Sequence, residues 1–347
     1  MTQDFIIIGA GIAGLSAAAE LAALGRVLVL EAEAAPAHHA SGRSAALYEP
    51  RYGLPAVVEL SLASEAAFRA MPDMLKPRGL MILARADQRV AFEKDLAGFQ
   101  LQEVAVETAR ARVPIVNPET VAFAAMADHA WDIDTDLLIQ GHIKRLRAQG
   151  GEVLCRAPVS AITREGGQWQ VETPQGAFAA PVLVNAAGAW ADRVAALAGI
   201  APLGLTPYRR SMARIPAPGG HDVTDWPMIF GCGESWYAKP DAGALIVSPA
   251  EEDPQDPQDA WADDMVLAEG LARYEEMVTE PVTRLIANWA GLRTFAPDRV
   301  LVIGPDAAEP SFVWLAGQGG YGFQTSPAAA GLVADLLAGR APAVGQA

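Results

Sequence analysis

Three glycines near the N-terminus are spaced for binding a phosphate group. Gly9, Gly11 and Gly14 follow a short apolar run, residues 5–8, and precede an alanine-rich segment. The first glycine permits a tight turn, the second lets the backbone approach a pyrophosphate, and the third lets a helix pack closely on the strand. The pyrophosphate would then lie against the amides and the positive dipole end of that helix.

A carboxylate follows at the distance expected for a ribose ligand. Residues 26–30 form a second apolar run ending at Glu31, 22 residues after Gly9 (31 − 9). In a dinucleotide-binding fold this carboxylate binds the ribose hydroxyls and repels a 2′-phosphate. Strand, glycine loop, helix, strand and acid all occur within about 30 residues, so a glycine-rich turn without function is the weaker interpretation. The motif does not distinguish NAD from FAD.

Composition and charge predict a soluble protein of two domains. The chain has 347 residues and is 51% hydrophobic, which is enough for two domains with a large core. Its apolar runs are shorter than the roughly 20 residues that cross a membrane, and no signal peptide precedes the first strand. We therefore expect a cytoplasmic location, with peripheral association with the inner membrane as an alternative. The net charge of −15 argues against a nucleic-acid partner.

Two pairs of residues could suggest a metal site, and neither predicts one. Cys155 and Cys232 are too few for a zinc site and are expected to be reduced thiols. His38 and His39 are adjacent, so their side chains point in different directions, and no carboxylate cluster is near them. A solvated loop is the favoured interpretation of the histidine pair.

Three alternating aspartates also resemble a metal loop. Asp132, Asp134 and Asp136 occur in the string WDIDTD, which lacks the glycine and the terminal glutamate of a calcium site. A helix predicted over 135–149 needs an N-cap and an acidic first turn, which these aspartates would supply. No metal site is therefore expected.

Later segments predict further parts of the nucleotide fold. The run 182–190 (VLVNAAGAW) predicts a buried strand ending in small residues, where a doubly wound sheet binds its ligand. The loop 317–322 exposes its backbone ahead of a helix predicted over 326–337. Hairpins are expected from residue 153 onward. The polar, proline-containing insertion 251–259 is expected to be an exposed loop, with an active-site lid as the alternative.

Five motifs occur in one order along the chain: GAGIAG with Glu31, SGRSAA, VLVNAAGAWAD, WAGLRTFAPD and GQGGYGFQTS. Together they resemble the D-amino-acid oxidase (DAO) family of FAD-dependent oxidoreductases, which includes glycine and sarcosine oxidases. The resemblance runs nearly end to end. The strings RRS, DWPM, YAKPDAG and AGLR make it look most similar to bacterial D-arginine dehydrogenases.

The resemblance implies an α/β fold with two domains. A Rossmann-like, discontinuous FAD-binding domain would comprise residues 1–75, 135–200 and 296–347. A β-rich α+β substrate-binding domain would comprise residues 76–134 and 201–295. FAD would be bound non-covalently, because family members with covalent flavin use a cysteine late in the chain and none follows Cys232 here.

The resemblance also implies which residues contact FAD. Arg43, Ser44 and Ala45 would lie against the reactive face of the flavin near N5. The segment 319–325 would lie by the pyrimidine end, where the positive end of the following helix would stabilise charge on the reduced flavin. The full expected set is Gly9, Gly11, Ala13, Gly14, Glu31, Arg43, Ser44, Ala45, Val159, Ala187, Gly188, Trp190, Gly291, Arg293, Gly319, Gly320, Tyr321, Gly322, Gln324 and Thr325.

Four residues match the family's substrate-binding positions. Arg210 and Arg293 would clamp the substrate carboxylate with their planar guanidinium groups. Arg209 is adjacent to Arg210 on a predicted strand, so only one of the two can face the pocket. Tyr237 would support the carboxylate and Tyr52 would close over the substrate. The alternatives are structural ion pairs for the arginines and half-buried core positions for the tyrosines.

The implied reaction is oxidative deamination of a D-amino acid to the 2-oxo acid and ammonia, by hydride transfer from Cα to flavin N5. O₂ or a quinone or other electron-transfer acceptor would then reoxidise the flavin. Leu47 and Leu80 stand where D-arginine dehydrogenases carry a histidine and a carboxylate. Burying an unpaired guanidinium costs several kcal/mol, so apolar or small side chains are expected to be preferred over D-arginine.

Three other functions remain open. The first is a flavin oxidase of glycine- or sarcosine-type secondary amines or of a 2-hydroxy acid. The second is an NAD-dependent dehydrogenase, which the interrupted nucleotide domain disfavours. The third is a non-catalytic flavin-binding protein, which would have no need of a carboxylate clamp.

Overall fold

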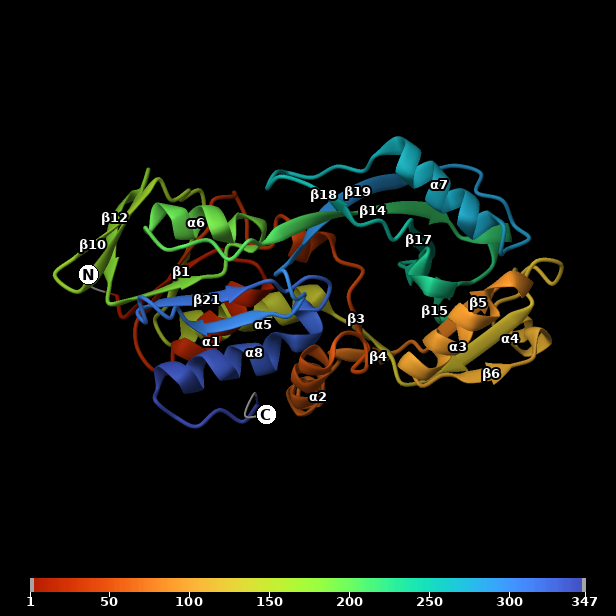
Figure 1. Ribbon diagram of the computed structural model, residues 1–347, viewed down its shortest axis with the longest axis horizontal. Helices are drawn as coiled ribbons and strands as arrows, with labels where there is room; N and C mark the ends of the chain where they lie inside the picture. The colour runs from red at the N-terminus through yellow and green to blue at the C-terminus, as the bar shows by residue number, and fades with distance from the viewer. Residues whose placement is uncertain (1–2, 345–347) are drawn as a thin grey trace.

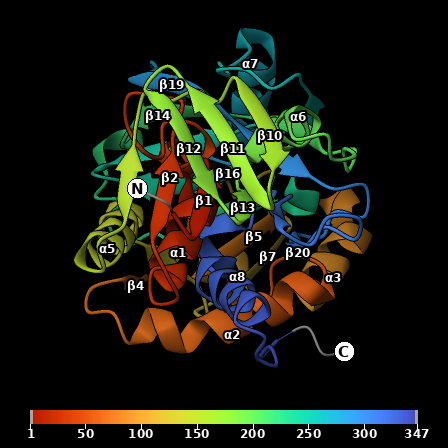
Figure 2. The same cartoon turned by 90° about the vertical axis from the view of Figure 1, so that its left-hand side faces the viewer.

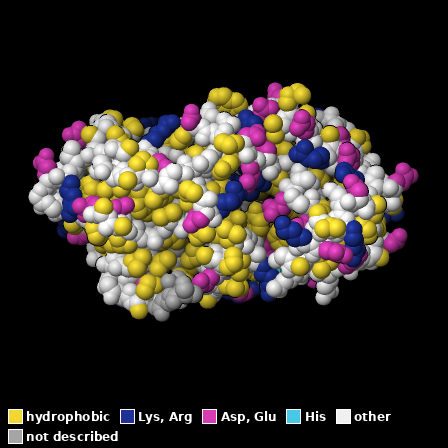
Figure 3. Space-filling view, viewed as in Figure 1, with side chains coloured by type: hydrophobic (Ala, Val, Ile, Leu, Met, Phe, Trp, Pro, Cys, Tyr) yellow, Lys and Arg dark blue, Asp and Glu magenta, His cyan; other side chains and the backbone are white. Residues whose placement is uncertain are grey.

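The computed structural model describes residues 3–344, and Figure 1 shows an elongated molecule. One sheet with its helices forms one half, and a larger sheet with its own helices forms the other. On the face in Figure 3, acidic and basic side chains are interspersed and hydrophobic side chains gather over the left-hand half. This face therefore has no basic stripe of the kind that nucleic acids need.

A six-stranded sheet forms the centre of the first half. Its order is β20-β21-β13-β1-β2-β9, with parallel pairing except between β20 and β21. The strands are β1 (Phe5–Ile8), β2 (Val27–Leu30), β9 (Glu152–Leu154), β13 (Val182–Asn185), β20 (Val302–Pro305) and β21 (Phe312–Ala316). Because β1 connects to neighbours on both sides, the chain reverses its winding there, which is where such sheets bind their ligands.

Both faces of this sheet are covered, which explains the continuous apolar runs of its strands. Ile7 on β1 packs with α1 (Ile12–Leu21), α5 (Thr135–Ala148) and α8 (Gly322–Leu337). Ile6 packs on the other face with α6 and a three-stranded antiparallel sheet. Figure 2 shows that small sheet in front of the parallel strands. Its elements are α6 (Ala191–Leu197), β10 (Ala161–Glu165), β11 (Gln168–Thr173) and β12 (Gly176–Ala180).

The second half contains a nine-stranded sheet. Its order is β18-β14-β17-β16-β15-β5-β7-β6, and β19 pairs with β14. The strands are β5 (Leu80–Ala84), β6 (Gln102–Val104), β7 (Phe123–Ala127), β14 (Thr206–Pro216), β15 (Met228–Gly231), β16 (Tyr237–Asp241), β17 (Ala244–Ser248), β18 (Asp253–Pro254) and β19 (Ala287–Phe295). Helices α3 (Arg89–Gly98), α4 (Val106–Arg112) and α7 (Asp264–Glu275) accompany it.

A small sheet joins the two halves. It consists of β3 (Leu47–Tyr48), β8 (Trp131–Ile133) and β4 (Leu75–Pro77), and α2 (Pro55–Arg69) lies beside α8. The strands of the six-stranded sheet come only from the segments expected to bind FAD. The strands of the nine-stranded sheet come only from the segments expected to bind substrate. The exact division at residues 75, 134, 200 and 295 stays a prediction.

Several local expectations need correction. The hairpin expected from residue 153 begins later, because residues 152–154 pair with β2 in parallel. Helix α8 starts at Gly322, four residues before the expected 326, although Pro327 lies inside it. Pro327 has no N–H for the carbonyl of Phe323, and the Ser326 hydroxyl donates to that carbonyl at 2.9 Å instead.

The three aspartates of WDIDTD have different partners. Asp134 is the N-cap of α5, and its carboxylate accepts a hydrogen bond from the Leu137 amide, as expected. Asp132 does not cap the helix. It lies on β8 and pairs with Arg78 and Lys239, so only part of this motif serves the helix.

The insertion 251–259 is held against the protein, although parts of it are exposed. Its β18 pairs with Tyr208 and Arg209 on β14, and the Glu251 carboxylate accepts a hydrogen bond from the Ser211 amide at 2.7 Å. Asp259, at its end, forms an ion pair with Arg43. Within residues 3–344, no helix is long and apolar enough to cross a membrane.

A buried histidine makes the stability of the fold depend on pH. His142 lies on the inner face of α5, and neither ring nitrogen has a hydrogen-bond partner among the described residues. Burial, reinforced by nearby Arg145, lowers the pKa of His142 to about 4. The unfolded chain, with an ordinary histidine pKa of about 6.5, therefore binds the proton more readily between these values.

We predict that the free energy of unfolding falls by roughly 2 kcal/mol between pH 7 and pH 5 through His142 alone. Stability contributed by neutral His142 is present above pH 6.5 and is lost as the pH falls toward 4. In His142→Leu this part of the pH dependence disappears, as measured by urea unfolding at both pH values. His221→Leu, at an exposed histidine, is the control, and equal behaviour of the two variants would contradict the prediction.

Candidate active site

A large cavity, with a volume of about 540 Å³, lies between the two sheets. Its walls come from the carboxyl ends of β1 and β13, from the loop that precedes β3, from β14 and β19, and from the loop that precedes α8. The cavity therefore joins the expected cofactor half of the molecule to the expected substrate half.

The first glycine loop forms one end of the cavity. Gly9 has a positive φ of 103°, and a Cβ there would press on the Ala186 carbonyl at the end of β13. A Cβ on Gly14 would collide with the Gly9 carbonyl, so this glycine allows α1 to lie against β1. At the start of α1 the Ile12 amide donates to the Ser41 hydroxyl at 3.0 Å, and Gly11 and Ala13 line the cavity, so the positive end of the α1 dipole lies at the space that a phosphate would occupy.

Glu31 is buried at the end of β2. One carboxylate oxygen accepts a hydrogen bond from the Ala10 amide at 2.8 Å, and the other accepts from the Glu33 amide at 2.9 Å. The carboxylate lines the cavity and retains lone pairs for further donors, such as ribose hydroxyls. These contacts fix the acid next to the glycine loop, as its spacing in the sequence predicts.

The second glycine loop, residues 317–322, also lines the cavity. Gly319 has a φ of 52°, and a Cβ there would collide with the ring of Phe295. A Cβ on Gly320 would lie 3.1 Å from the Arg293 guanidinium. Phe295 and Arg293 on β19 therefore explain why this loop requires glycines.

Two buried polar atoms in the cavity wall suit a polar cofactor. Gln318 Nε2 and Thr294 Oγ1 have no hydrogen-bond partner among the described residues. An unpaired buried donor costs free energy, so such atoms are expected where a ligand completes them. Together with Glu31 and the N-terminal end of α1, they fit the heteroatoms of a dinucleotide.

Most of the residues expected to contact FAD line this cavity. They are Gly9, Gly11, Ala13, Glu31, Arg43, Ser44, Ala45, Val159, Ala187, Gly188, Trp190, Gly291, Arg293, Gly319, Gly320 and Gly322. The structure brings them together from segments up to 313 residues apart in sequence (322 − 9). Their contacts with FAD stay predictions.

Four expected residues lie outside the cavity wall. Gly14 packs α1 on β1, and Tyr321 packs against Phe295 and Tyr52. Gln324 is buried and donates to the Tyr52 carbonyl at 3.2 Å. Thr325 donates to the Tyr321 carbonyl at 2.8 Å. These residues support the loops that form the cavity wall. The sequence alone does not distinguish residues that support these loops from residues that line the cavity.

The two expected carboxylate binders lie on neighbouring strands and both line the cavity. Arg210 on β14 is paired with Gly291 on β19, and Arg293 follows two residues later on the same face of β19. Arg209 is directed elsewhere, to Asp253 at 2.7 Å. Of the two adjacent arginines, Arg210 is thus the one at the cavity.

Arg210 is buried and has little compensation for its charge. Its Nη2 contacts Glu252 at 3.3 Å, and its Nε has no partner among the described residues. Burial, followed by the nearby charge of Arg293, lowers the pKa of Arg210. For Arg293, burial acts to lower the pKa, but the phenols of Tyr52 and Tyr237 outweigh it and the pKa rises.

The two expected tyrosines lie next to these guanidinium groups, outside the main cavity wall. The Tyr52 hydroxyl donates to Glu234 at 3.0 Å, and its ring stacks on Phe99. The Tyr237 hydroxyl contacts the sulfur of Met212 at 3.5 Å. Burial, only partly opposed by Arg293, raises the pKa of Tyr52, so its phenol stays protonated and can donate.

The expected side-chain residues belong to an apolar cluster beside the tyrosines. Leu80 is 1% exposed and Leu47 is half-buried, and neither lines the main cavity. Both pack in the cluster that contains Phe99, Tyr237 and Met212. Figure 1 shows β3, which contains Leu47, between the two halves, and β5, which contains Leu80, within the right-hand half.

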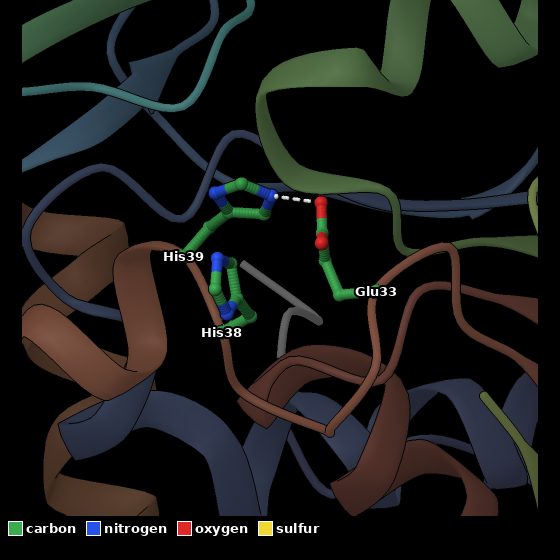
Figure 4. A group of neighbouring side chains, drawn as sticks. All are labelled: Glu33, His38 and His39. Atoms are coloured by element: carbon green, nitrogen blue, oxygen red, sulfur yellow. Dashed lines mark hydrogen bonds and ion pairs between the residues drawn. The ribbon is translucent and has the colours of Figure 1, made fainter. Parts of the chain in front are cut away.

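The histidine pair is more ordered than the solvated loop that the sequence predicts. His39 is half-buried, and its Nε2 lies 2.9 Å from a Glu33 carboxylate oxygen while its ring contacts Trp190. Figure 4 shows Glu33, His38 and His39 together, with ligand atoms within 4.8 Å of one another. All three line the cavity beside Glu31, so they belong to its nucleotide end.

Sequence reasoning missed several residues of the cavity wall. Gln318 and Thr294 lie inside two recognised motifs, GQGGYGFQTS and WAGLRTFAPD, and their polarity inside glycine-rich or apolar segments was the signal that could have found them. Gln258 and Ala260 come from the end of the 251–259 insertion and the residue after it. Because the end of this insertion lines the cavity, its position favours an active-site lid over an exposed loop.

Nearly the whole chain matches one family of known proteins. The model of the DAO family of FAD-dependent oxidoreductases matches residues 4–336. The chain belongs to this family. It is an FAD-dependent oxidoreductase, and the glycine loops, Glu31 and the unpartnered donors of the cavity are the residues that would hold FAD.

Individual relatives are distant. Bovine FAD-dependent oxidoreductase domain-containing protein 1 is 25% identical over 399 residues, covering 96% of this chain and 81% of the relative. L-2-hydroxyglutarate dehydrogenase from Escherichia coli is 27% identical over 240 residues, which cover 64% of this chain and 56% of the relative. The solved structure of glycine oxidase from Geobacillus kaustophilus has a TM-score of 0.85 at 21% identity and covers 100% of this chain and 97% of that one.

These comparisons confirm the α/β fold with a Rossmann-like FAD-binding domain, and FAD as cofactor. They do not support the finer resemblance to D-arginine dehydrogenases, because the relative that aligns with 96% of this chain is an FAD-dependent oxidoreductase domain-containing protein. That expectation rested on short strings such as DWPM and YAKPDAG, of which the second is largely strand β16 and its turn.

We predict that Glu31→Gln raises the dissociation constant for FAD by roughly tenfold or more, because a charge-assisted hydrogen bond is worth about 1.5–3 kcal/mol. Titration of the apoprotein with FAD, followed by quenching of flavin fluorescence, measures the change. Glu20→Gln is the matched control, because Glu20 does not line the cavity and its carboxylate pairs with Arg145 at 2.8 Å. Equal effects of the two substitutions would show that Glu31 has no special part in binding.

Proposed function

We propose that this protein oxidises the Cα–N bond of a D-amino acid with an apolar or small side chain, giving the 2-oxo acid and ammonia. The observation that carries the proposal is the position of Arg210 and Arg293. Two guanidinium groups line the FAD cavity, next to an apolar cluster and two tyrosines. The D configuration is supported by the resemblance to the D-amino-acid oxidase family.

The arginine pair suits the carboxylate of an amino acid. The two positive charges repel each other, which contributes to the lowered pKa of Arg210. Glu252 compensates Arg210 only at 3.3 Å and is shared with Arg299. A substrate carboxylate between the two guanidinium groups would satisfy both with paired, charge-assisted hydrogen bonds.

The tyrosines would complete this clamp. Tyr52, with its raised pKa, has a proton to donate at neutral pH. Its present acceptor, Glu234, is exposed, so the Tyr52 hydroxyl can exchange that partner for a substrate oxygen. Within residues 3–344 the Tyr237 hydroxyl has one hydrogen-bond partner, the weak acceptor sulfur of Met212, which leaves this hydroxyl available as well.

Bound FAD supplies the two-electron acceptor for the hydride that leaves Cα. The protein's part is to hold the carboxylate, aim Cα at the flavin and keep water away from the reacting bond. The substrate must present a neutral amine, and the imino acid that results is hydrolysed to the 2-oxo acid and ammonia. No nucleophilic side chain is needed.

The apolar cluster would select the substrate side chain. Leu80 and Leu47 offer no partner to a guanidinium, and Met212, Phe99 and Tyr237 complete the same cluster. A buried, unpaired charge there would cost several kcal/mol. Turnover of D-arginine should therefore be weak compared with that of D-alanine, D-valine or D-methionine.

The deciding experiment is an anaerobic titration of the FAD-loaded protein with a panel of candidate substrates. The panel contains D- and L-amino acids, glycine, sarcosine, proline and 2-hydroxy acids, and loss of the flavin absorption band reports reduction. We expect apolar D-amino acids to bleach the flavin while their L-enantiomers and D-arginine do not.

The other results would separate the remaining functions. Bleaching by glycine, sarcosine or proline alone would replace the substrate by a small or secondary amine, the substrate type of the structurally similar glycine oxidase. Bleaching by 2-hydroxy acids alone would favour the reaction type of the related L-2-hydroxyglutarate dehydrogenase. Efficient reduction by D-arginine would refute the assignment of the apolar cluster.

We predict that Arg210→Met raises KM for the best amino acid by roughly 100-fold, because a charge-assisted hydrogen-bonded pair with the carboxylate is lost. The absorption spectrum of bound FAD should remain. Arg209→Met is the matched control, since Arg209 pairs with Asp253 away from the cavity, and its KM should change less than about threefold. A similar KM in both variants would remove Arg210 from the clamp.

A further inference from the structure

Lys239 is a buried cation that the proposed reaction does not use. It lies on β16, two residues after Tyr237, and is only 9% exposed. Its Nζ donates to the carbonyls of Ala45 and Ala46 at 2.7 Å each and forms an ion pair with Asp132 at 2.9 Å. All three protons of the ammonium group thus have a partner.

The two carbonyls belong to the loop that lines the FAD cavity. Ser44 and Ala45 form part of the cavity wall, and Ala46 packs into the core behind it. The loop's own hydrogen bonds near this point are few, with the Ala46 amide donating to the Ser44 hydroxyl at 3.1 Å. Because a peptide group is planar, holding two successive carbonyls also fixes the direction of the intervening amide.

Packing of the core does not explain the buried ion pair between Lys239 and Asp132. Burial acts to lower the pKa of Lys239, and Asp132 opposes that shift. Asp132 in turn accepts a hydrogen bond from Arg78 Nε at 2.8 Å. Replacing a buried ion pair by apolar residues is often neutral or stabilising, so core packing alone gives no reason for a lysine here.

We propose that Lys239 is a positioning residue that fixes the cavity loop 44–46 against bound FAD. Tyr237 and Lys239 lie two residues apart on one face of β16. Tyr237 would then contact the substrate, while Lys239 would hold the loop that lies against the cofactor. The assignment requires FAD binding, which family membership establishes, and does not depend on the identity of the substrate.

The chain provides a matched control in Arg78. Both Lys239 and Arg78 are buried cations that pair with Asp132. Arg78 makes its other hydrogen bonds to the carbonyls of Thr224 at 2.6 Å and Trp226 at 2.8 Å, away from the cavity loop. Removing either cation leaves Asp132 with one partner, but only removal of Lys239 releases the loop.

The experiment compares Lys239→Met, Lys239→Arg and Arg78→Met. The dissociation constant of FAD from each apoprotein and the midpoint potential of the bound flavin are measured, and neither measurement needs a substrate. We expect Lys239→Met to raise the dissociation constant at least about tenfold and to shift the potential, because two hydrogen bonds to a charged donor are lost. Lys239→Arg should recover much of both, and Arg78→Met should stay within about threefold of the unaltered protein.

Two results would overturn the proposal. If Lys239→Met binds FAD with unchanged affinity and potential, the loop needs no positioning by Lys239. If Arg78→Met produces the same changes as Lys239→Met, the network only stabilises the fold. Should Lys239→Met not fold, the double variant Lys239→Met/Asp132→Asn, which removes the donors to the carbonyls without leaving the Asp132 carboxylate short of a partner, is measured instead, and an unaltered affinity together with an unaltered potential again rejects the proposal.

Discussion

The antiparallel pairing of β14 with β19 is the constraint on which the site depends. Its register sets Arg210 opposite Gly291 and Tyr208 opposite Arg293. A Cβ at Gly291 would lie 3.6 Å from Arg43 Cβ, in ordinary van der Waals contact, so the segment that contains Arg43 lies directly over this strand. A slip of β19 by one residue against β14 would turn Arg293 to the other face of the sheet and away from Arg210, so the charge of the site is fixed by strand register.

Lys239, Arg78 and Arg210 differ in how completely their charges are paired. This difference distinguishes cations that hold the fold in place from a cation that can bind a substrate anion. Lys239 and Arg78 use their donors on Asp132 and on backbone carbonyls. Arg210 has one long contact to Glu252 and an unpartnered Nε among the described residues. Within the described chain, Arg210 thus retains more capacity for an incoming anion than the two fully paired cations do.

Sequence patterns predicted features that depend on near neighbours. The glycine loop, Glu31 and the Asp134 cap were predictable because each acts on backbone groups a few residues away or at a fixed distance along one βαβ unit. Alternation along a strand indicates only that one of Arg209 and Arg210 faces inward, without saying which. The resemblance to the family pointed to Arg210, and the structure places Arg210 at the cavity. Asp132 was assigned to the start of the helix because it precedes that helix in the sequence. Its partners, Arg78 and Lys239, are distant in sequence.

The sequence by itself determined the unit of strand, glycine loop, helix, strand and Glu31, which predicts a dinucleotide site at the N-terminus, and the order of motifs indicated the family. Only the tertiary structure decided that Asp132 pairs with Lys239, 107 residues away (239 − 132), and that Gln318 and Thr294 bring polar atoms into the cavity. It also decided that the 251–259 insertion packs beside the cofactor site instead of standing free. The physical reason is that turns and caps are specified by local backbone sterics and hydrogen bonds, whereas ion pairs and cavity walls depend on which strands the sheet brings side by side.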